Sequence, residues 1–422
     1  MQRSHACKPP LTFSATPPLS LGPGEPGPEG QGEGPQHLSA RRTSAVAPSA
    51  VVAGGGIAGL AAAVALRAVG VEAVAHEQAA ALREAGAGIG LWPNATRALT
   101  RLGVLDAVAA TSGRATSITI CDARGRTLAH VPVGGVALCA HRGELLAALR
   151  AALPDTAVRT AARVEGFHDA GDRVRVSVGD AAAETPLLVG ADGLRSRVRA
   201  ALVGGEPPRF TGMTVWRALG PDVGGTPEGA AVETWGDGAR FGRFDAGAAP
   251  DGTARTYWYA VQTRREGVPA EDAEVQKAAL LRLFDRWHAP VCDAIAATPA
   301  EAILCHDVYD RPPVRRTHGG RVVLVGDAAH AATPDLGQSG AMALEDAVAL
   351  AACVAGAASV PDALAAFARL RRRRTAIITR QSRVAGRVGQ AAGLPGRVRN
   401  AALRMTPSAA FGALFGWPFR GG

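Results

Sequence analysis

The chain has 422 residues, 47% of them apolar, and a formal net charge of +9. This length suits two domains, and the absence of an uncharged apolar run of about 18 residues argues against a membrane span. The six cysteines are scattered without a C-x-x-C pair, which favours a reduced, cytoplasmic protein over a zinc site or a disulfide framework.

The positive charge is concentrated at the end of the chain. Residues 369–422 contain 12 Arg and no Asp or Glu, so removing these 12 charges from +9 leaves −3 for the rest. No aromatic-basic interleaving accompanies the arginines, and we therefore expect no nucleic-acid partner. A patch for acidic membranes stays open, but a solvated helical face, or one packed on the acidic body, is favoured. Residues 1–47 are rich in Pro, Gly and Ser and predict a disordered tail.

The first predicted elements surround a glycine-rich turn. An apolar strand at 51–53 breaks into Gly54, Gly56 and Gly59 in a G-x-G-x-x-G pattern, a helix follows at 60–69, and a strand at 71–77 ends on Glu77. The three glycines permit a tight turn, close approach of a pyrophosphate, and close helix packing. The Glu77 carboxylate can accept from both ribose hydroxyls and would repel the 2′-phosphate of NADP. The unit predicts a site for FAD or NAD.

The middle of the chain predicts a β-hairpin, a helix and then an antiparallel sheet. Strands at 117–121 and 127–133 and a helix at 142–153 come first. From about residue 209, short aromatic-bearing runs at 214–219, 231–235, 239–244 and 255–263 are separated by Gly, Pro and Asp. These runs predict an antiparallel sheet followed by a helix at 273–287.

The last segment returns to the strand–turn–helix pattern. An apolar strand from residue 321 breaks at Gly326-Asp327, a Pro/Gly loop follows, and helices are expected at 340–354 and 361–382. Asp327 could bind a ribityl hydroxyl, and the positive end of the first helix could face the N1–C2=O edge of a flavin. A second distant contact of this kind favours FAD over NAD.

With these segments in order, the chain resembles the FAD-dependent aromatic hydroxylases of the para-hydroxybenzoate hydroxylase type, in the branch with urate hydroxylase and zeaxanthin epoxidase. The motifs that carry the resemblance are the glycine turn with Glu77, residues 190–199 (GADGLRSRVR) and residues 326–346, with weaker support from residues 88–94, Arg142 and residues 210–217.

The resemblance implies an α/β fold, a Rossmann-like FAD-binding domain interrupted by an antiparallel-sheet substrate domain and followed by C-terminal helices. The expected boundaries are 1–47 for the tail, 48–205 and 312–368 for the FAD-binding domain, 206–311 for the substrate domain, and 369–422 for the Arg-rich helical segment.

The resemblance also implies roles for matching residues. Those expected to contact FAD are Gly54, Gly56, Ile57, Ala58, Gly59, Glu77, Gln78, Gly90, Arg142, Val164, Asp192, Asp327, Pro334, Gly337, Gln338, Ser339, Gly340, Ala341 and Met342. Asp192 is also expected to support transient use of NAD(P)H. Ser339 stands where such proteins usually have Gly, so its side chain could crowd the flavin or place a hydroxyl beside it. Arg240 and Tyr257 are the candidate catalytic residues that contact substrate, His330 is expected to pack or hydrogen-bond, and no metal is expected.

The implied activity is that of an FAD-dependent monooxygenase. NADPH or NADH would reduce the flavin, and a C4a-hydroperoxyflavin formed with molecular oxygen would hydroxylate or epoxidise a small aromatic, heteroaromatic or alkene-bearing molecule. A halogenase or a reductase of isoprenoid double bonds is an alternative, although the W-x-W-x-I-P motif of a halogenase is absent. A non-catalytic carrier of a nucleotide or acyl chain is a second alternative. The oligomeric state stays open.

Overall fold

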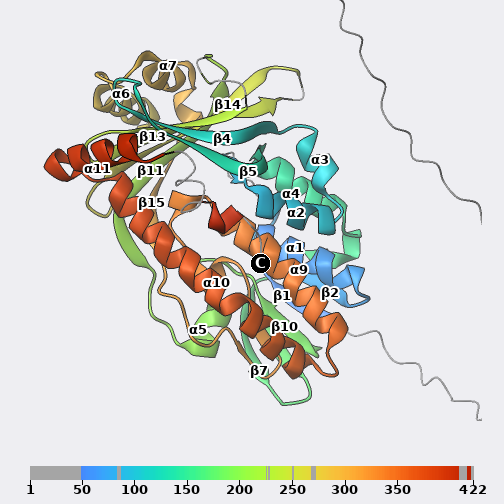
Figure 1. Cartoon of the computed structure of the whole chain (residues 1–422). Coiled ribbons are helices and arrows are strands. Elements are labelled where there is room, and N and C mark those ends of the chain that lie inside the picture. The colour runs from blue at the N-terminus through green and yellow to red at the C-terminus, as the bar shows by residue number, and fades with distance from the viewer. Residues whose placement is uncertain are drawn as a thin grey trace, which may run out of the picture. The chain divides into compact units, whose positions relative to one another are not determined.

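The structure is a computed structural model that describes residues 49–82, 87–224, 226, 229–249, 251–267, 272–407 and 416–419. The predicted tail at 1–47 lies outside the described residues. The two large sheets are joined by helices that run between them (Figure 1).

A six-stranded sheet forms the nucleotide-binding half. Its spatial order is β16 (His318–Gly319), β17 (Val322–Leu324), β10 (Leu187–Gly190), β1 (Ser49–Ala53), β2 (Glu72–His76) and β6 (Val158–Arg159). The strands from β17 to β6 run parallel, and only β16 is antiparallel. Their near-continuous Val, Ala and Leu side chains are typical of a parallel sheet covered on both faces.

Two apolar helices bury one side of this sheet. Helix α1 (Ile57–Ala68) follows the glycine turn and packs against α9 (Ser339–Gly356), although 270 residues separate Ala68 from Ser339 in the sequence numbering. The smaller helices of this half are α2 (Pro93–Arg101), α3 (Leu105–Ala109), α4 (Arg142–Ala151), α5 (Arg197–Val203), α8 (Asp327–His330) and the 3-10 turns η1 (Asp155–Ala157) and η3 (Pro334–Leu336). A three-stranded sheet of β7 (Val164–Asp169), β8 (Val174–Val178) and β9 (Ala181–Thr185) lies beside them.

The second large sheet has eight strands. In spatial order they are β15 (Leu304–Asp310), β11 (Arg209–Pro221), β14 (Ala254–Thr263), β13 (Ala239–Ala248), β12 (Ala230–Trp235), β4 (Gly113–Asp122), β5 (Thr127–His141) and β3 (Gly88–Leu91). The pairing is antiparallel throughout except between β12 and β4.

Three strands of this sheet come from the first part of the predicted FAD-binding domain. The sequence assigned residues 48–205 to the FAD-binding domain, but β3, β4 and β5 are hydrogen-bonded into the eight-stranded sheet. The reason is the parallel pairing of residues 117–122 with 230–235, a contact between segments that no local pattern connects.

One face of the eight-stranded sheet is covered by α6 (Ala273–Leu283) and α7 (Ala289–Ala297), followed by the 3-10 turn η2 (Ala300–Ala302) (Figure 1). Trp258, Phe241 and Phe284 form the centre of this core. Helix α6 ends four residues earlier than the expected 273–287. The aromatic residues of the sheet therefore divide between this core and the opposite face, which is available to a ligand.

The C-terminal helices connect the two halves. Helix α10 (Val360–Gly389) is longer than the expected 361–382 and continues across the predicted boundary at 368/369, and α11 (Gly393–Met405) follows. The short turn η4 (Trp417–Phe419) packs on Trp92 at a ring distance of 4.9 Å. Among the described residues, α9 is the helix whose length and hydropathy would allow a membrane crossing, and half of it is buried inside the protein.

Candidate active site

The glycine turn at the end of β1 has the geometry that its sequence predicts. Gly54 has φ +107°, its N–H donates to the His76 carbonyl at 2.8 Å, and a Cβ there would lie 2.5 Å from the Ala191 oxygen. A Cβ on Gly59 would lie 1.9 Å from the Gly54 oxygen, so this helix residue must also be glycine. Gly56 differs, because a Cβ there would meet nothing within 4 Å. Its surroundings are the space that an approaching pyrophosphate needs.

Glu77 is oriented by the same turn. One carboxylate oxygen accepts from the Gly55 N–H at 2.8 Å and the other from the Ala79 N–H at 2.9 Å. The residue is half-buried at the end of β2, while Gln78 beside it is exposed. Two backbone amides therefore hold the carboxylate at the mouth of the turn and leave lone pairs free for further hydrogen bonds.

Asp327 lies at the same edge of the sheet as the glycine turn. Strand β17 ends at Leu324, Gly326 turns with φ +57°, and a Cβ on Gly326 would lie 2.7 Å from the Ala58 Cβ in α1. The second predicted motif thus touches the first helix directly. One extended ligand can reach both, because the carboxyl ends of parallel strands meet at one edge.

Asp327 and Arg142 lie close enough for their charges to interact, and we call the space around these two residues the recess. Both residues are exposed to solvent, yet the protein around them is dense enough to shift their pKa values by desolvation. Burial raises the pKa of Asp327, and the positive charges of His330 and Arg142 oppose this rise. Burial also lowers the pKa of Arg142, assisted by the nearby charge of Arg217. Side chains that are open to solvent but surrounded by protein are typical of a ligand cavity.

The loop from Pro334 to Met342 closes this recess. Gly337 adopts φ +60°, and a Cβ there would lie 2.4 Å from Trp92 Nε1. Pro334 is exposed, Gln338 is fully buried, and Ala341 and Met342 are buried in the first turns of α9. A Cβ on Gly340 would lie 2.8 Å from Ile89 Cδ1. The loop therefore leads directly into the positive end of the 18-residue helix α9.

The Ser339 hydroxyl points back to its own loop. Its Oγ donates to the Ala332 carbonyl at 3.4 Å, a long hydrogen bond within the same loop. The serine therefore has a backbone partner of its own at the position where glycine is usual.

Several buried polar atoms around the recess have no partner among the described residues. They are Trp92 Nε1, Asn94 Oδ1, Gln338 Nε2, Thr333 Oγ1 and Arg217 Nε. Asn94 Nδ2 is satisfied, because it donates to Gln338 Oε1 and to Glu345 Oε1, each at 3.0 Å. Unsatisfied buried groups are rare in native proteins, and their gathering here fits a polar group that completes the site. The residues present therefore fit FAD.

Two predicted cofactor residues have structural roles as well. Asp192 caps α5, since its carboxylate accepts from Ser196 Oγ at 2.5 Å and from the Arg197 N–H at 2.7 Å. Val164 is buried in β7, so a contact with the cofactor must come from its backbone. The chain just before it lies beside the ribose end, because the Ala162 N–H donates to the Glu77 carbonyl at 2.8 Å. Ile57 is likewise buried in the core, whereas Gly90 in β3 is half-buried near Trp92.

His330 belongs to a buried network that supports the loop from behind. Its Nε2 lies 2.6 Å from Asp346 Oδ2, which also accepts from the Gly326 N–H at 3.0 Å. Arg371 of α10 donates to the other Asp346 oxygen at 2.7 Å and to Glu345 at 2.8 Å. Burial would raise the pKa of Asp346, but His330, Arg371 and these hydrogen bonds lower it to about 2. The hydrogen-bonding role expected for His330 fits these contacts.

The Arg240 side chain lies in a buried ion-pair network and not in an open pocket. Its side chain is 3% exposed and pairs with Glu233 at 3.1 Å and with Asp335 of the loop. Burial would lower the pKa of Arg240, but the two carboxylates raise it above its ordinary value. Arg240 therefore ties β13 to the loop beside the flavin position, and direct contact with substrate stays a prediction.

Tyr257 lies on the face of the sheet toward the recess. Its ring stacks across Gly88, where a Cβ would lie 2.3 Å from the ring Cγ. Burial raises the pKa of the phenol to about 12, although the charges of Arg217 and Arg142 oppose this. The same arginines, after burial, lower the pKa of His306. Tyr257, Arg142, Arg217 and His306 thus form one cluster. No local sequence pattern had pointed to His306.

Comparison with known proteins places this arrangement in a family. A family model described as an FAD binding domain matches residues 48–382. Aurachin C monooxygenase/isomerase of Stigmatella aurantiaca is 40% identical over 323 residues, covering 74% of this chain and 82% of the relative. The 2-heptyl-3-hydroxy-4(1H)-quinolone synthase of Pseudomonas aeruginosa is 34% identical over 346 residues, covering 79% and 87%.

A solved structure shares the fold over nearly its whole length. Klebsiella pneumoniae HpxO, complexed with FAD and uric acid, has a TM-score of 0.81 and 27% identity, covering 88% of this chain and 96% of HpxO. The chain therefore belongs to the FAD-binding-domain family, in the group of para-hydroxybenzoate hydroxylase type, and is an FAD-dependent monooxygenase that uses NAD(P)H.

Proposed function

We propose that the protein oxygenates a planar nitrogen heterocycle that bears an ionisable hydroxy or oxo group, such as a quinolone. The observation that carries this proposal is the cluster of Arg142, Arg217, His306 and Tyr257 on the sheet face beside the recess. One relative and HpxO support it, because the name of the relative includes a quinolone and the HpxO structure contains uric acid, and both are oxygenated nitrogen heterocycles.

The charge of this cluster favours an oxyanion. Arg217 has a buried Nε without a partner among the described residues, and its charge depresses the pKa values of Arg142 and His306. A positive site lowers the pKa of a bound hydroxy group and so favours its ionised form. An ionised hydroxy group makes its ring electron-rich, which is what transfer of an electrophilic oxygen atom requires.

Tyr257 is a hydrogen-bond donor under all ordinary conditions. Because its pKa is about 12, the phenol keeps its proton well above neutral pH. It can donate that proton to the same substrate oxygen that Arg217 attracts, and its ring gives an apolar surface for a planar ring system.

For the cofactor, we propose that Glu77 binds the ribose, the Gly54–Gly59 turn the pyrophosphate, Asp327 the ribityl chain, and the Pro334–Met342 loop with the first turn of α9 the isoalloxazine. Bound FAD supplies the redox chemistry, in which NAD(P)H gives two electrons, one oxygen atom of O2 enters the substrate, and the other leaves as water. The protein holds the substrate against this loop and excludes water. The buried apolar side chains of Trp92 and Met342 favour this exclusion of water.

We also infer that the protein works in a reducing compartment, the cytoplasm, without a membrane span. The five cysteines in the described part of the chain (Cys121, Cys139, Cys292, Cys305 and Cys353) are all free. Free cysteines are typical of reducing compartments.

The test is a screen of hydroxy- and oxo-quinolines and purines with FAD-loaded protein. A substrate should accelerate NAD(P)H oxidation and gain one oxygen atom by mass, and parallel assays with NADH and NADPH identify the donor. Arg217→Gln should raise KM by roughly tenfold or more, the effect of losing one charge-assisted hydrogen bond. Arg265→Gln is the control, because Arg265 is exposed after β14.

Two results would contradict the proposal. An active substrate of this class whose KM is the same with Arg217→Gln would show that the cluster does not bind it. Acceleration only by neutral hydrocarbons would replace the proposed substrate class with an alkene-bearing one.

A further inference from the structure

An exposed apolar surface lies far along the chain from the active-site motifs. Among the described residues, nine large hydrophobic side chains are exposed, and five of these fall between residues 384 and 405. They are Val384 (57% exposed), Val388 (44%), Leu394 (72%), Val398 (61%) and Met405 (83%). Scattered exposed apolar residues need no explanation, but a gathering of this kind indicates an interaction site.

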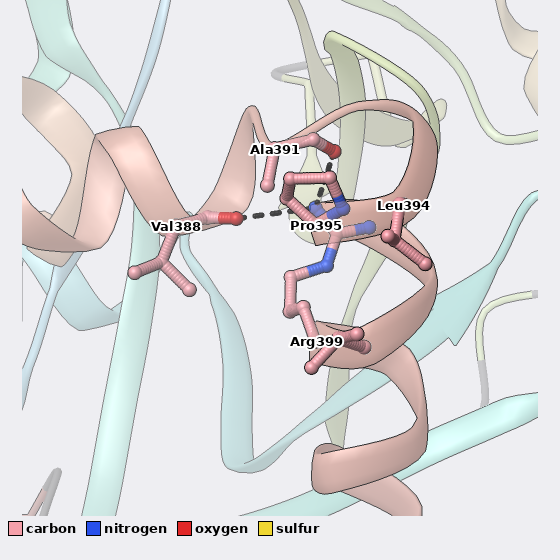
Figure 2. A pocket seen from close by; sticks show the side chains of 6 residues that line it. Val388, Ala391, Leu394, Pro395 and Arg399 are labelled. Carbon is pink, nitrogen blue, oxygen red and sulfur yellow. Dashed lines mark hydrogen bonds between the residues drawn. The ribbon is translucent and has the colours of Figure 1, made fainter.

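The five residues form one surface on two helices. Leu394, Val398 and Met405 are spaced four and seven residues apart, so they lie along one side of α11. Val388 lies in the last turn of α10. A shallow hollow is lined by Val388, Ala391, Leu394, Pro395, Val398 and Arg399. Figure 2 shows Val388, Ala391, Leu394 and Pro395 around the guanidinium of Arg399. We call Val384, Val388, Leu394, Val398 and Met405 the C-terminal apolar surface.

Other residues of α11 fix the helix to the protein. Arg399 donates to the Gly389 carbonyl at 2.7 Å, and its guanidinium lies 5.1 Å from the centre of the Trp235 ring. Arg404 pairs with Asp122 at 2.8 Å, and Leu403 packs against the cluster around Ile120. These contacts therefore hold the helix in place while its apolar side faces solvent.

Basic residues accompany this surface. Arg380, Arg387 and Arg397 are exposed on the same helices, and the sequence contains no Asp or Glu after Asp362. The arginines of this region that contact the body, such as Arg371 and Arg383, are paired with buried carboxylates and add no free charge to it. The exposed Asp237 carboxylate accepts from the Gly393 N–H at 3.2 Å at the start of α11, but with Arg380, Arg387 and Arg397 the surround carries a net positive charge. An apolar surface with such a surround is complementary to an anionic partner. It opposes a second copy of this chain, because a two-fold contact would bring like charges together.

We propose that the C-terminal apolar surface docks the protein onto an anionic lipid bilayer. Helix α11 lies in the plane of the interface, with Leu394, Val398 and Met405 in the boundary between head groups and acyl chains and with Arg387 and Arg397 at the phosphate level. An amphipathic helix with apolar residues on one side and arginines beside them binds membranes in this way. The contact is peripheral, and it does not depend on which substrate the active site accepts.

The experiment is flotation of the FAD-loaded protein with vesicles of phosphatidylcholine alone and of an equal mixture with phosphatidylglycerol. Wild-type protein should float with the mixed vesicles, and much less with phosphatidylcholine alone or at high salt. The double variant L394E/V398E should bind the vesicles at least about tenfold more weakly. It replaces two apolar side chains that would enter the bilayer by negative charges that the anionic lipid repels. R387Q/R397Q should lose binding only to the anionic vesicles. Val275→Glu is the matched control, because Val275 is 49% exposed on α6.

Flavin absorbance and NAD(P)H oxidation in solution should be unchanged in all these variants, which shows that each is folded. The proposal is overturned if wild-type protein stays free of anionic vesicles. It is also overturned if L394E/V398E binds as well as Val275→Glu does. Light scattering without lipid tests whether the surface is a contact between copies of the chain instead. That reading would be supported if wild-type protein were oligomeric, the L394E/V398E variant were monomeric, and neither bound vesicles.

Discussion

Glu77 shows how one side chain can serve both the fold and the ligand. Its carboxylate accepts from the Gly55 and Ala79 amides, so its orientation is fixed before any ribose arrives. Such prior ordering reduces the conformational entropy that binding must offset.

Replacing Glu77 by Gln should therefore weaken FAD binding while keeping the size of the side chain. The variant loses the charge and one acceptor, and we expect the FAD dissociation constant to rise by roughly tenfold to a hundredfold. Titration of flavin fluorescence measures this directly. Glu72→Gln is the control, because Glu72 lies on the same strand with its side chain 59% exposed. Equal affinities for the two variants would remove Glu77 from the ribose site.

Asp346 is the residue whose charge the fold most clearly requires. Its pKa is lowered to about 2 from an ordinary 3.8, so ionisation is favoured by folding. A carboxyl with a depressed pKa contributes stability that is present above about pH 3.8 and is lost as the pH falls through about 2. The shift corresponds to about 2 kcal/mol.

Asp346→Asn should accordingly lower the free energy of unfolding by about 2 kcal/mol at pH 7, with a difference from wild type that shrinks below pH 4. Urea unfolding at pH 7, 5, 4 and 3 follows this difference. Asp180→Asn, at an exposed position in the β8–β9 turn, should have no effect at any of these pH values. A deficit for Asp346→Asn that stays constant down to pH 3 would show that lost packing, and not lost charge, is the cause.

At the scale of elements, α10 is more than a cover for the nucleotide-binding half. Its last two turns carry Gly386 and Gly389, where a Cβ would lie 2.5 Å from Asp335 Oδ2 and 2.8 Å from Arg240 Cδ. The two glycines let the helix approach the buried ion pair that joins the loop to β13. Three elements therefore meet at this ion pair and hold the loop: β12 through Glu233, β13 through Arg240, and α10 through its two glycines.

Gly389→Ala should disturb this joint without touching the ligand. The added methyl must displace an arginine whose guanidinium is fixed by two carboxylates, and overpacking of this kind costs about 1–3 kcal/mol. We expect a larger fraction of NAD(P)H to be consumed without product, because the loop closes less well over the site. The ratio of product formed to NAD(P)H oxidised is the measurement. Gly356→Ala, where a Cβ meets nothing, should leave that ratio unchanged.

The elements also show what the sequence could and could not predict. The strands and helices next to Gly54, Gly59 and Gly326 were predictable, because a backbone conformation or a close approach requires glycine there. The membership of residues 113–141 in the second sheet was not, since it depends on pairing with residues some 110 positions away. The length of α10 was underestimated because its glycines, usually helix-ending, are used here for packing.

The candidate site divides in the same way. Residues in motifs, such as Glu77 and Asp327, were found from sequence alone. His306 was missed, because the register that joins β11 to β15 and brings it near Arg217 is tertiary. Arg240 was singled out, but its carboxylate partner Asp335 lies 95 residues away and could not be inferred from local pattern.

At the scale of the whole molecule, the site is where distant parts of the chain meet. The glycine turn, the Asp327 junction, the loop before α9 and the face of the eight-stranded sheet come from four separate segments. A ligand bound among them stabilises only the folded state, so stability and FAD concentration must be linked. At FAD concentrations about 100 times the dissociation constant, this linkage is worth about 2.7 kcal/mol.

Asp327→Ala should uncouple stability from the cofactor. Without the ribityl contact, we expect FAD affinity to fall by roughly tenfold to a hundredfold, and the FAD-dependent rise in melting temperature at a fixed FAD concentration to shrink with it. The melting temperature of the protein without FAD should change little, because no hydrogen bond from the Asp327 side chain supports the described part of the fold. Asp180→Ala should keep the full rise. If Asp327→Ala also kept it, the junction after β17 would not bind the flavin, and the single ligand joining both motifs would have to take another path across the sheet edge.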